Sequence, residues 1–178
     1  HGGVELLERG LPGYEWHSLT LPPRHFRWRI RGNPLSWLNE PLLEQSWDLV
    51  IATSMVDLAT LRGIQPGLAR TPAIAYFHEN QFAYPDRRTG QGSNEPGIVN
   101  LYTALSADRV LFNSDWNRRS LIEGVEKLMR QLPDHKPRDL TRRLEDKSEV
   151  VPVPIGSGVF SGRDRDWSPV PHLLCNHR

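Results

Sequence analysis

The chain has 178 residues, of which 38% are hydrophobic and 24% are charged, as is ordinary for a globular protein. Its formal net charge of +1 excludes a general attraction to nucleic acid or membranes, so any surface that binds a polyanion must be local. The single cysteine, Cys175, excludes an internal disulfide, and no apolar stretch approaches the roughly 18 residues of a membrane span, so we expect a cytoplasmic protein.

The first part of the chain predicts a helix and then a strand. Residues 4–9 carry apolar side chains at helical spacing and are followed by Gly10, a common residue just after a helix. Residues 14–21 predict a strand, which Pro22 and Pro23 close. A helix that opens the chain without a strand before it indicates that the first strand of the domain is missing.

Arginines alternate with large apolar side chains over residues 24–31, and two interpretations stay open. The segment can be a half-buried strand with Phe26, Trp28 and Ile30 toward the core and the arginines toward water. It can also bind RNA, because arginine contacts phosphate and both guanidinium groups and aromatic rings stack on unpaired bases. An outward arginine row can do both. The RNA-binding candidates are Arg24, Arg27, Trp28, Arg29 and Arg31.

Strands and helices alternate through the rest of the chain. Apolar runs predict strands at 47–52, 73–78, 109–113 and 148–155. Helical spacing predicts helices at 55–62, 98–106, 115–132 and 138–144, with Ser114 as an N-cap and a mobile loop at 86–97. This order predicts an α/β fold, a Rossmann-like parallel sheet with helices on both faces.

A run of polar side chains follows the strand at 73–78. His78 can exchange a proton near neutral pH, Glu79 can accept one, and Asn80 and Gln81 both donate and accept hydrogen bonds; Tyr84 lies a few residues on. Ligands of parallel sheets bind just beyond the carboxyl ends of the strands. The alternative is a strand end whose polar groups only cap backbone, but four such residues in succession favour a binding site.

A second polar pair follows the next strand. Asn113 and Ser114 lead into a helix N-terminus, which would bring backbone N–H groups to the same edge of the sheet; a plain capped helix is the alternative. The chain has no P-loop, C-x-x-C, G-x-S-x-G or H-E-x-x-H motif and no histidine spacing suited to zinc. We therefore predict neither a metal site nor a cofactor.

These residues resemble the N-terminal domain of the tRNA-queuosine mannosyltransferase family, which belongs to the family-4-like retaining glycosyltransferases of the GT-B fold. The resemblance spans essentially the whole chain. The segments that carry it are 20–22, 28–29, 76–81 with 84–85, 107–108 with 112–114, 132–140 and 176–178. It implies an acceptor-side Rossmann-like domain over residues 1–155, a linker over 156–171 and the start of a donor-binding domain over 172–178.

The resemblance also implies an activity and its residues. The full-length enzyme would transfer mannose from GDP-mannose to queuosine in a tRNA anticodon with retention of configuration, without a membrane partner. His78 and Glu79 would be catalytic, and this chain alone would be inactive without the donor-binding domain. The acceptor-binding residues would be Asn80, Gln81, Tyr84, Asn113, Ser114, His135 and Lys136. For His135 and Lys136, a stiff connector between helices is the alternative interpretation.

Two other functions stay open. A family-4-like glycosyltransferase that acts on a lipid or polysaccharide usually has a basic amphipathic helix at a membrane face, whereas the helix after Ser114 carries Glu123 and Glu126 among its basic residues, as an ordinary surface helix does. A non-catalytic RNA-binding module would use the arginine row at 24–31 and leave the residues around His78 without a chemical role.

Overall fold

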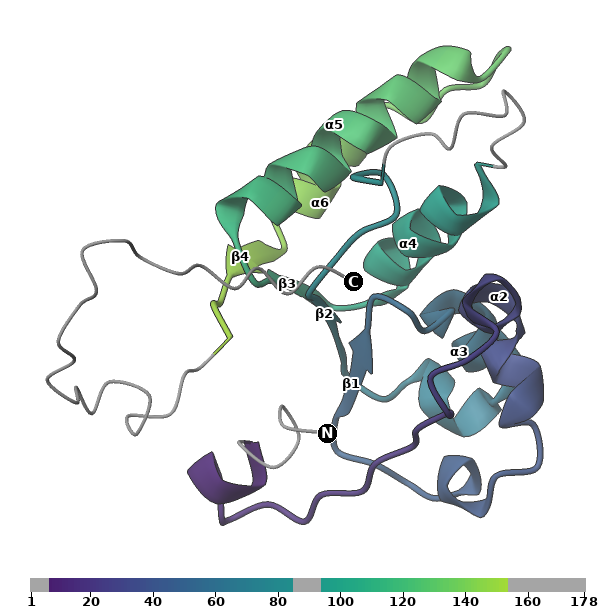
Figure 1. Cartoon of the computed structure of the whole chain (residues 1–178), viewed down its shortest axis with the longest axis vertical. Coiled ribbons are helices and arrows are strands. Elements are labelled where there is room, and N and C mark those ends of the chain that lie inside the picture. The colour runs from purple at the N-terminus through teal and green to yellow at the C-terminus, as the bar shows by residue number, and fades with distance from the viewer. Residues whose placement is uncertain (1–6, 85–93, 154–178) are drawn as a thin grey trace, which may run out of the picture.

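The computed structural model describes residues 7–84 and 94–153, in which four strands form one sheet (Figure 1). The strands lie in the order β1-β2-β3-β4, and each pair of neighbours is parallel. Parallel neighbours cannot be joined by a tight turn, so each connection crosses back over the sheet. The strands are β1 Val50–Thr53, β2 Ala73–Phe77, β3 Arg109–Phe112 and β4 Ser148–Val150.

Helices supply these crossovers. Figure 1 shows α4 and α5 extending alongside each other over the sheet, and α2 and α3 together beside β1. The helices with described bounds are α2 Phe26–Ser36, α3 Leu58–Ile64, α4 Glu95–Ser106, α5 Asp115–Gln131 and α6 Leu140–Glu145, with 3₁₀ turns η1 Pro41–Glu44 and η2 Pro66–Ala69. None of the helices in this part of the chain is long and apolar enough to cross a membrane.

One face of the sheet forms the main core. In β2, Ala73, Ala75 and Phe77 are buried while the side chains between them are only half-buried. The ring of Phe77 packs against that of Phe112 in β3, with centroids 5.2 Å apart, and residues of α3 to α6 cover them. The predicted parallel Rossmann-like sheet is therefore confirmed, and the described helices provide one of its two expected layers.

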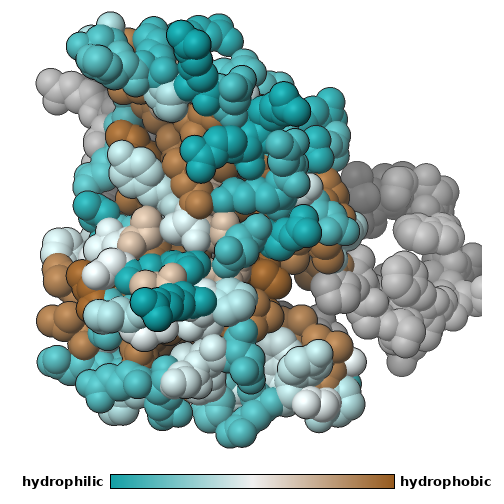
Figure 2. Space-filling view, turned by 180° about the vertical axis from the view of Figure 1, so that it is seen from behind, coloured by the Kyte–Doolittle hydropathy of each residue, from teal (hydrophilic) through white to brown (hydrophobic). Residues whose placement is uncertain are grey.

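The opposite face of the sheet is less covered within the described ranges. Ile51 in β1 is 40% exposed, and Tyr76 in β2 is half-buried with its hydroxyl donating to the carbonyl of Val151. Apolar surface also appears elsewhere, and Figure 2 shows it from behind as separate brown patches between hydrophilic groups. Isolated exposed apolar side chains of this kind are normal for a folded domain.

The strand predicted at 14–21 is wrong. These residues form no strand or helix in the structure, and Leu19 and Leu21 instead pack against a second apolar cluster that contains Trp37. Backbone pairing needs a free sheet edge beside the segment, and alternation along the chain does not show whether one is there.

The half-buried strand predicted over 24–31 is also wrong, because α2 occupies this region. The large buried side chains here, Ile30 and Asn33 in α2 and Trp37 just after it, are three or four residues apart, which is the period of a helix. Phe26 and Trp28, which the strand interpretation placed in the core, are 59% and 62% exposed. The apparent alternation came from the arginines, which tolerate both structures.

The later elements agree with the prediction within a few residues. Ser114 caps α5 by accepting a hydrogen bond from the backbone N–H of Asn117, and α3 continues through Gly63 to Ile64. α4 begins at Glu95, so the predicted loop at 86–97 falls largely outside the described residues, as do the predicted linker and the start of a second domain. β4 ends at Val150.

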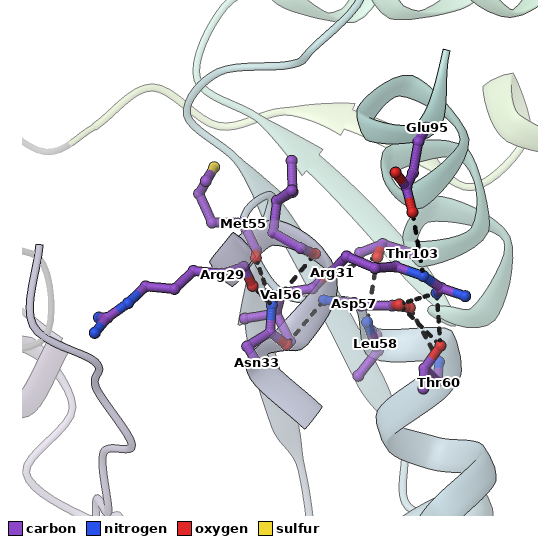
Figure 3. A network of polar contacts seen from close by, with 11 residues as sticks. Arg29, Arg31, Asn33, Met55, Val56, Asp57, Leu58, Thr60, Glu95 and Thr103 are labelled. Carbon is purple, nitrogen blue, oxygen red and sulfur yellow. Dashed lines mark hydrogen bonds and ion pairs between the residues drawn. The ribbon is translucent and has the colours of Figure 1, made fainter. Parts of the chain in front are cut away.

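A polar network fastens α2 to the rest of the domain (Figure 3). The buried Asn33 donates to the carbonyl of Met55 at 2.9 Å and accepts from the backbone N–H of Asp57 at 3.2 Å. The buried carboxylate of Asp57 caps α3 through the backbone N–H of Thr60 at 3.1 Å and pairs with the guanidinium of Arg31. Each buried polar group in this junction has a partner, as burial requires.

This network predicts a strong effect of removing the Asp57 carboxylate. Asp57→Ala should lower the free energy of unfolding by about 2–3 kcal/mol, because it removes a helix cap and a hydrogen-bonded ion pair at a buried position. Glu126→Ala, which removes only the exposed pair of Glu126 with Arg130, should cost less than about 0.5 kcal/mol. Urea unfolding of both variants measures the difference, and equal losses would contradict the assignment.

Candidate functional site

A pocket of about 280 Å³ lies beyond the carboxyl ends of β2 and β3, where the sequence predicted a site. Both strands end in a buried phenylalanine, and the chain then turns into polar residues on either side of the pocket. Its lining residues are His78, Glu79, Asn80, Ala83, Tyr84, Asn113, Ser114, Trp116 and Asn117. Six of the predicted site residues thus come together here.

A network of buried side-chain amides lies under the pocket. The Asn80 amide donates to Asn117 Oδ1 at 2.6 Å and to Ser120 Oγ at 2.9 Å, and its oxygen accepts from the backbone N–H of Ala83 at 3.1 Å. The Asn117 amide donates to the carbonyl of Phe77 at 2.8 Å. Asn80 and Asn117 are 1% and 2% exposed, so this network joins the turn after β2 to helix α5.

The amide of Asn113 links the two polar segments. Its Nδ2 donates to the backbone carbonyl of His78 at 2.9 Å, and its Oδ1 accepts from the amide of Asn117 at 2.9 Å. Ser114 Oγ accepts from the backbone N–H of Asn117 at 3.2 Å. Asn113 and Ser114 therefore hold the pocket together as well as lining it, and the plain helix cap that the sequence left open is present.

The ionisable side chains of the pocket are His78, Glu79 and Tyr84. Tyr84 donates its hydroxyl proton to Glu79 Oε2 at 2.5 Å, and His78 Nε2 lies 3.9 Å from Glu79 Oε1. The hydrogen bond to Glu79, together with burial and the charge of that carboxylate, raises the pKa of Tyr84 above its ordinary value. Tyr84 is therefore a hydrogen-bond donor at neutral pH, and the exposed imidazole of His78 is accessible from solvent.

The structure does not bring Gln81 into this pocket. Its backbone N–H donates to Asn100 Oδ1 at 2.7 Å, and its side-chain amide lies 3.9 Å from the sulfur of Met55. Asn100 is fully buried in α4 and donates in turn to the carbonyl of Ser54 at 2.8 Å. The backbone of Gln81 thus fixes the turn to α4, and its side chain points toward Met55, which lies between β1 and α3.

His135 and Lys136 lie away from the pocket, in the connection between α5 and α6. The Lys136 ammonium donates to the carbonyl of Arg130 at 3.1 Å, near the C-terminal end of α5, where a positive charge is favourable. His135 has a positive φ of 45°, as expected of a sharp connection. The hydrogen bond of Lys136 to Arg130 agrees with the alternative interpretation of this segment, a stiff connector between helices.

The arginine row also lies outside the pocket, on and before α2. Arg31 is held by Asp57 and by Thr60 Oγ1 at 3.0 Å, and Arg29 donates to the carbonyl of Pro22. Arg24 and Trp28 are exposed. The candidates for RNA binding therefore form a surface separate from the pocket, and Arg31 has an additional structural role.

Sequence reasoning missed the residues that support the pocket. Asn117 and Ser120 lie on the face of α5 that begins with Ser114, and both bond to Asn80. Polar side chains at spacing three on the core-facing side of an amphipathic helix are a signal that could have revealed them. Trp116, on the rim, had no comparable pattern around it.

The side chain of Phe82, in the turn after β2, packs between helices α4 and α5. A Cβ atom added to Gly124 of α5 would lie 2.4 Å from Phe82 Cβ, and one added to Gly97 of α4 would lie 2.8 Å from Phe82 Cε1. Both distances are far below van der Waals contact. The two glycines therefore let α4 and α5 close around Phe82, which fixes the turn that carries Asn80 and Gln81.

This close packing predicts the effect of one methyl group. Gly124→Ala should lower the free energy of unfolding by about 1–3 kcal/mol, because the clash involves the Cβ of Phe82, which cannot move without the backbone. Gly63→Ala in α3 has nothing within 4 Å of its added Cβ and should be neutral or stabilising by up to about 1 kcal/mol. Thermal unfolding followed by circular dichroism compares the two; a harmless Gly124→Ala would contradict this packing.

Within the described ranges, no group of three or more His, Cys, Asp or Glu side chains is placed to hold a metal ion. The fold and the pocket define a Rossmann-like α/β domain with a polar arrangement of side chains at the carboxyl edge of its sheet. A family model described as the N-terminal part of tRNA-queuosine alpha-mannosyltransferase matches residues 4–155. The chain belongs to this family, as the resemblance in its sequence predicted.

A curated relative supports the same assignment. The tRNA-queuosine alpha-mannosyltransferase of Drosophila melanogaster is 32% identical to the chain over 185 residues, a match that covers 98% of this chain and 49% of the relative. The chain thus spans about half the length of that protein. No solved structure matches the chain.

Proposed function

We propose that the full-length protein carrying this chain transfers mannose from GDP-mannose to queuosine in a tRNA anticodon, with retention of configuration. The observation that supports mannosyl transfer to tRNA queuosine most is the 32% identity, over 98% of the chain, to a relative named tRNA-queuosine alpha-mannosyltransferase. The GDP-mannose donor and the retention of configuration follow from the family resemblance in the sequence. This chain supplies the acceptor side, and a second domain supplies most of the donor site. On this proposal, residues 1–178 alone give no mannosylated tRNA.

The reaction changes three bonds. The bond from the sugar C1 to the diphosphate oxygen breaks and GDP leaves, a bond from C1 to an acceptor hydroxyl oxygen forms, and in this proposal the His78 imidazole accepts the hydroxyl proton. The transition state carries positive charge on the sugar, as in other glycosyl transfers. The protein must therefore orient the acceptor hydroxyl and place polar groups where charge develops.

In this proposal, each of these tasks falls to particular residues of the pocket. The exposed imidazole of His78 contacts the acceptor hydroxyl and the transferred sugar, and Glu79 accepts a hydrogen bond from the acceptor. The hydroxyl of Tyr84 donates its one proton to Glu79 at 2.5 Å, so its oxygen is left to accept a hydrogen bond in the same space. Asn80 has its amide engaged inside the protein, so in this proposal it positions the turn and does not bind the acceptor.

The tRNA contacts in the proposal come from the surface before and along α2. Arg24, Arg27 and Arg29 bind backbone phosphates, and the exposed ring of Trp28 stacks on an unpaired base. Arg31 contributes less, because its guanidinium is paired with the carboxylate of Asp57 and bonded to Thr60, whereas Arg29 donates to an uncharged carbonyl, that of Pro22. His135 and Lys136 are kept as candidates for an acceptor phosphate, with Lys136 also bound to the carbonyl of Arg130.

Removing the His78 imidazole tests the catalytic assignment. In the full-length protein, His78→Ala should lower kcat for mannosyl transfer by about 100-fold or more, because it removes the group that accepts the proton of the acceptor hydroxyl. His17→Ala removes an imidazole outside the pocket, next to Trp47, and should stay within about twofold of the unchanged protein. Mass spectrometry of nucleosides from treated tRNA measures the product, and full activity of His78→Ala would rule the assignment out.

Charge reversal tests the RNA surface. Arg27→Glu with Arg29→Glu should weaken binding of queuosine-containing tRNA and make the slope of log K against log salt shallower by about two phosphate contacts. Arg142→Glu with Arg143→Glu on α6 makes the same change of charge far from α2 (Figure 1) and should have a smaller effect. Gel-shift titrations over a salt series compare them, and equal affinities and slopes would remove α2 from the proposal.

A further inference from the structure

Trp116 is a large apolar side chain that the folded domain leaves in solvent at the rim of the pocket. Its side chain is 64% exposed, although the residues on either side of it in α5 are engaged. Ser114 caps the helix just before it, and the buried Asn117 just after it bonds to Phe77 and Asn80. The backbone that carries the indole is therefore rigid, while the indole itself is free to meet a ligand.

Packing within the described residues does not account for this ring. The core-facing residues of α5 are Leu121, Ile122, Val125 and Leu128, and Trp116 is not among the members of the core. None of the aromatic pairs found among the described residues includes it. A tryptophan exposed on a fixed backbone beside a pocket is typical of a contact surface for a flat ligand.

The surroundings of the indole narrow the class of ligand. A second exposed ring, that of Tyr84, lines the same pocket with its hydroxyl held by Glu79, so flat apolar surface and hydrogen-bonding groups occur together. Asp115, the residue before Trp116 in α5, pairs with Arg119 at 2.9 Å, so a cation offsets the charge of its carboxylate. This combination suits a planar heterocycle that carries hydroxyl groups and belongs to a polyanion.

We propose that Trp116 is the platform on which the planar base of the acceptor nucleoside stacks, so that the hydroxyl-bearing substituent of the base reaches His78 and Glu79. This inference rests on the proposed function and adds a specificity-determining residue to it. Stacking on an aromatic side chain accepts any base, so the ring supplies affinity and orientation, and the polar pocket beside it selects the substituent.

The test uses the full-length protein and three variants. Trp116→Ala should raise the KM for queuosine-containing tRNA by about tenfold, as loss of one base–aromatic stack does, and leave the KM for GDP-mannose unchanged. Trp116→Phe keeps a ring and should stay within about threefold of the unaltered protein. Tyr102→Ala removes another exposed aromatic side chain, from α4 and outside the pocket, and should leave both values unchanged.

The outcomes separate the inference from the function on which it rests. If the unaltered full-length protein forms no mannosylated queuosine, the proposed function is wrong and the inference fails with it. If that protein is active but Trp116→Ala behaves as Tyr102→Ala does, only the stacking inference is wrong. A change confined to the KM for GDP-mannose would place the indole against the donor and also overturn it. A lower melting temperature for Trp116→Ala than for Tyr102→Ala would show that the ring packs inside the protein, which contradicts the inference as well.

Discussion

The geometry of the pocket depends on a small set of buried amides. Asn80 and Asn117 are almost entirely buried, and leaving one of these amides unpaired would cost the domain about twice what a hydrogen bond normally contributes. Their partners are the turn after β2, the end of β3 and the first turns of α5. Displacing any one of these segments would break its hydrogen bonds to the other two, so the three move as one unit. The backbone that carries His78 and Glu79 is therefore held in a fixed position.

Helix packing supplies the second support of that unit. Phe82 occupies the space that two glycines leave between α4 and α5, and Asn100 of α4 holds the backbone of Gln81. The turn is thus fixed from below by amides and from the side by an aromatic ring. The residues that can contact a ligand are few and exposed, whereas a larger number of buried residues serve only to hold them. Mutations at the buried positions should therefore affect the site even though they touch no substrate.

The sequence predicted much of this arrangement, for identifiable reasons. Buried parallel strands produce continuous apolar runs, so β1, β2 and β3 were found near their observed positions, and Ser114 marked the start of α5. The polar run after β2 located the pocket, because strand ends converge at one edge of a parallel sheet. The match with known relatives agreed with the family that these motifs resemble.

The incorrect predictions came from sequence patterns that fit two different structures. Alternating arginine and aromatic residues over 24–31 suited a strand, but the burial of Ile30 and Asn33 follows a helical period, and the deciding partner of Asn33 lies more than twenty residues away at Met55. For the site, the sequence showed which residues were polar but not which were covered. The side chains of Asn80 and Gln81 looked as available as that of His78. Only the positions of Asn117 and Met55 reveal that the Asn80 amide is engaged and that the Gln81 amide lies against a sulfur outside the pocket.

The hydrogen bonds under the pocket and the ion pair that holds α2 respond differently to salt and pH. The bonds under the pocket join uncharged amides, hydroxyls and carbonyls, whose strength is insensitive to ionic strength and to pH in the physiological range. The junction of α2 instead contains the charged pair of Asp57 and Arg31, of which the arginine side is about half exposed and therefore partly screened by salt. Ionic strength can thus alter how firmly the arginine-rich helix is held without changing the shape of the pocket, so the two surfaces respond to different variables in the same buffer.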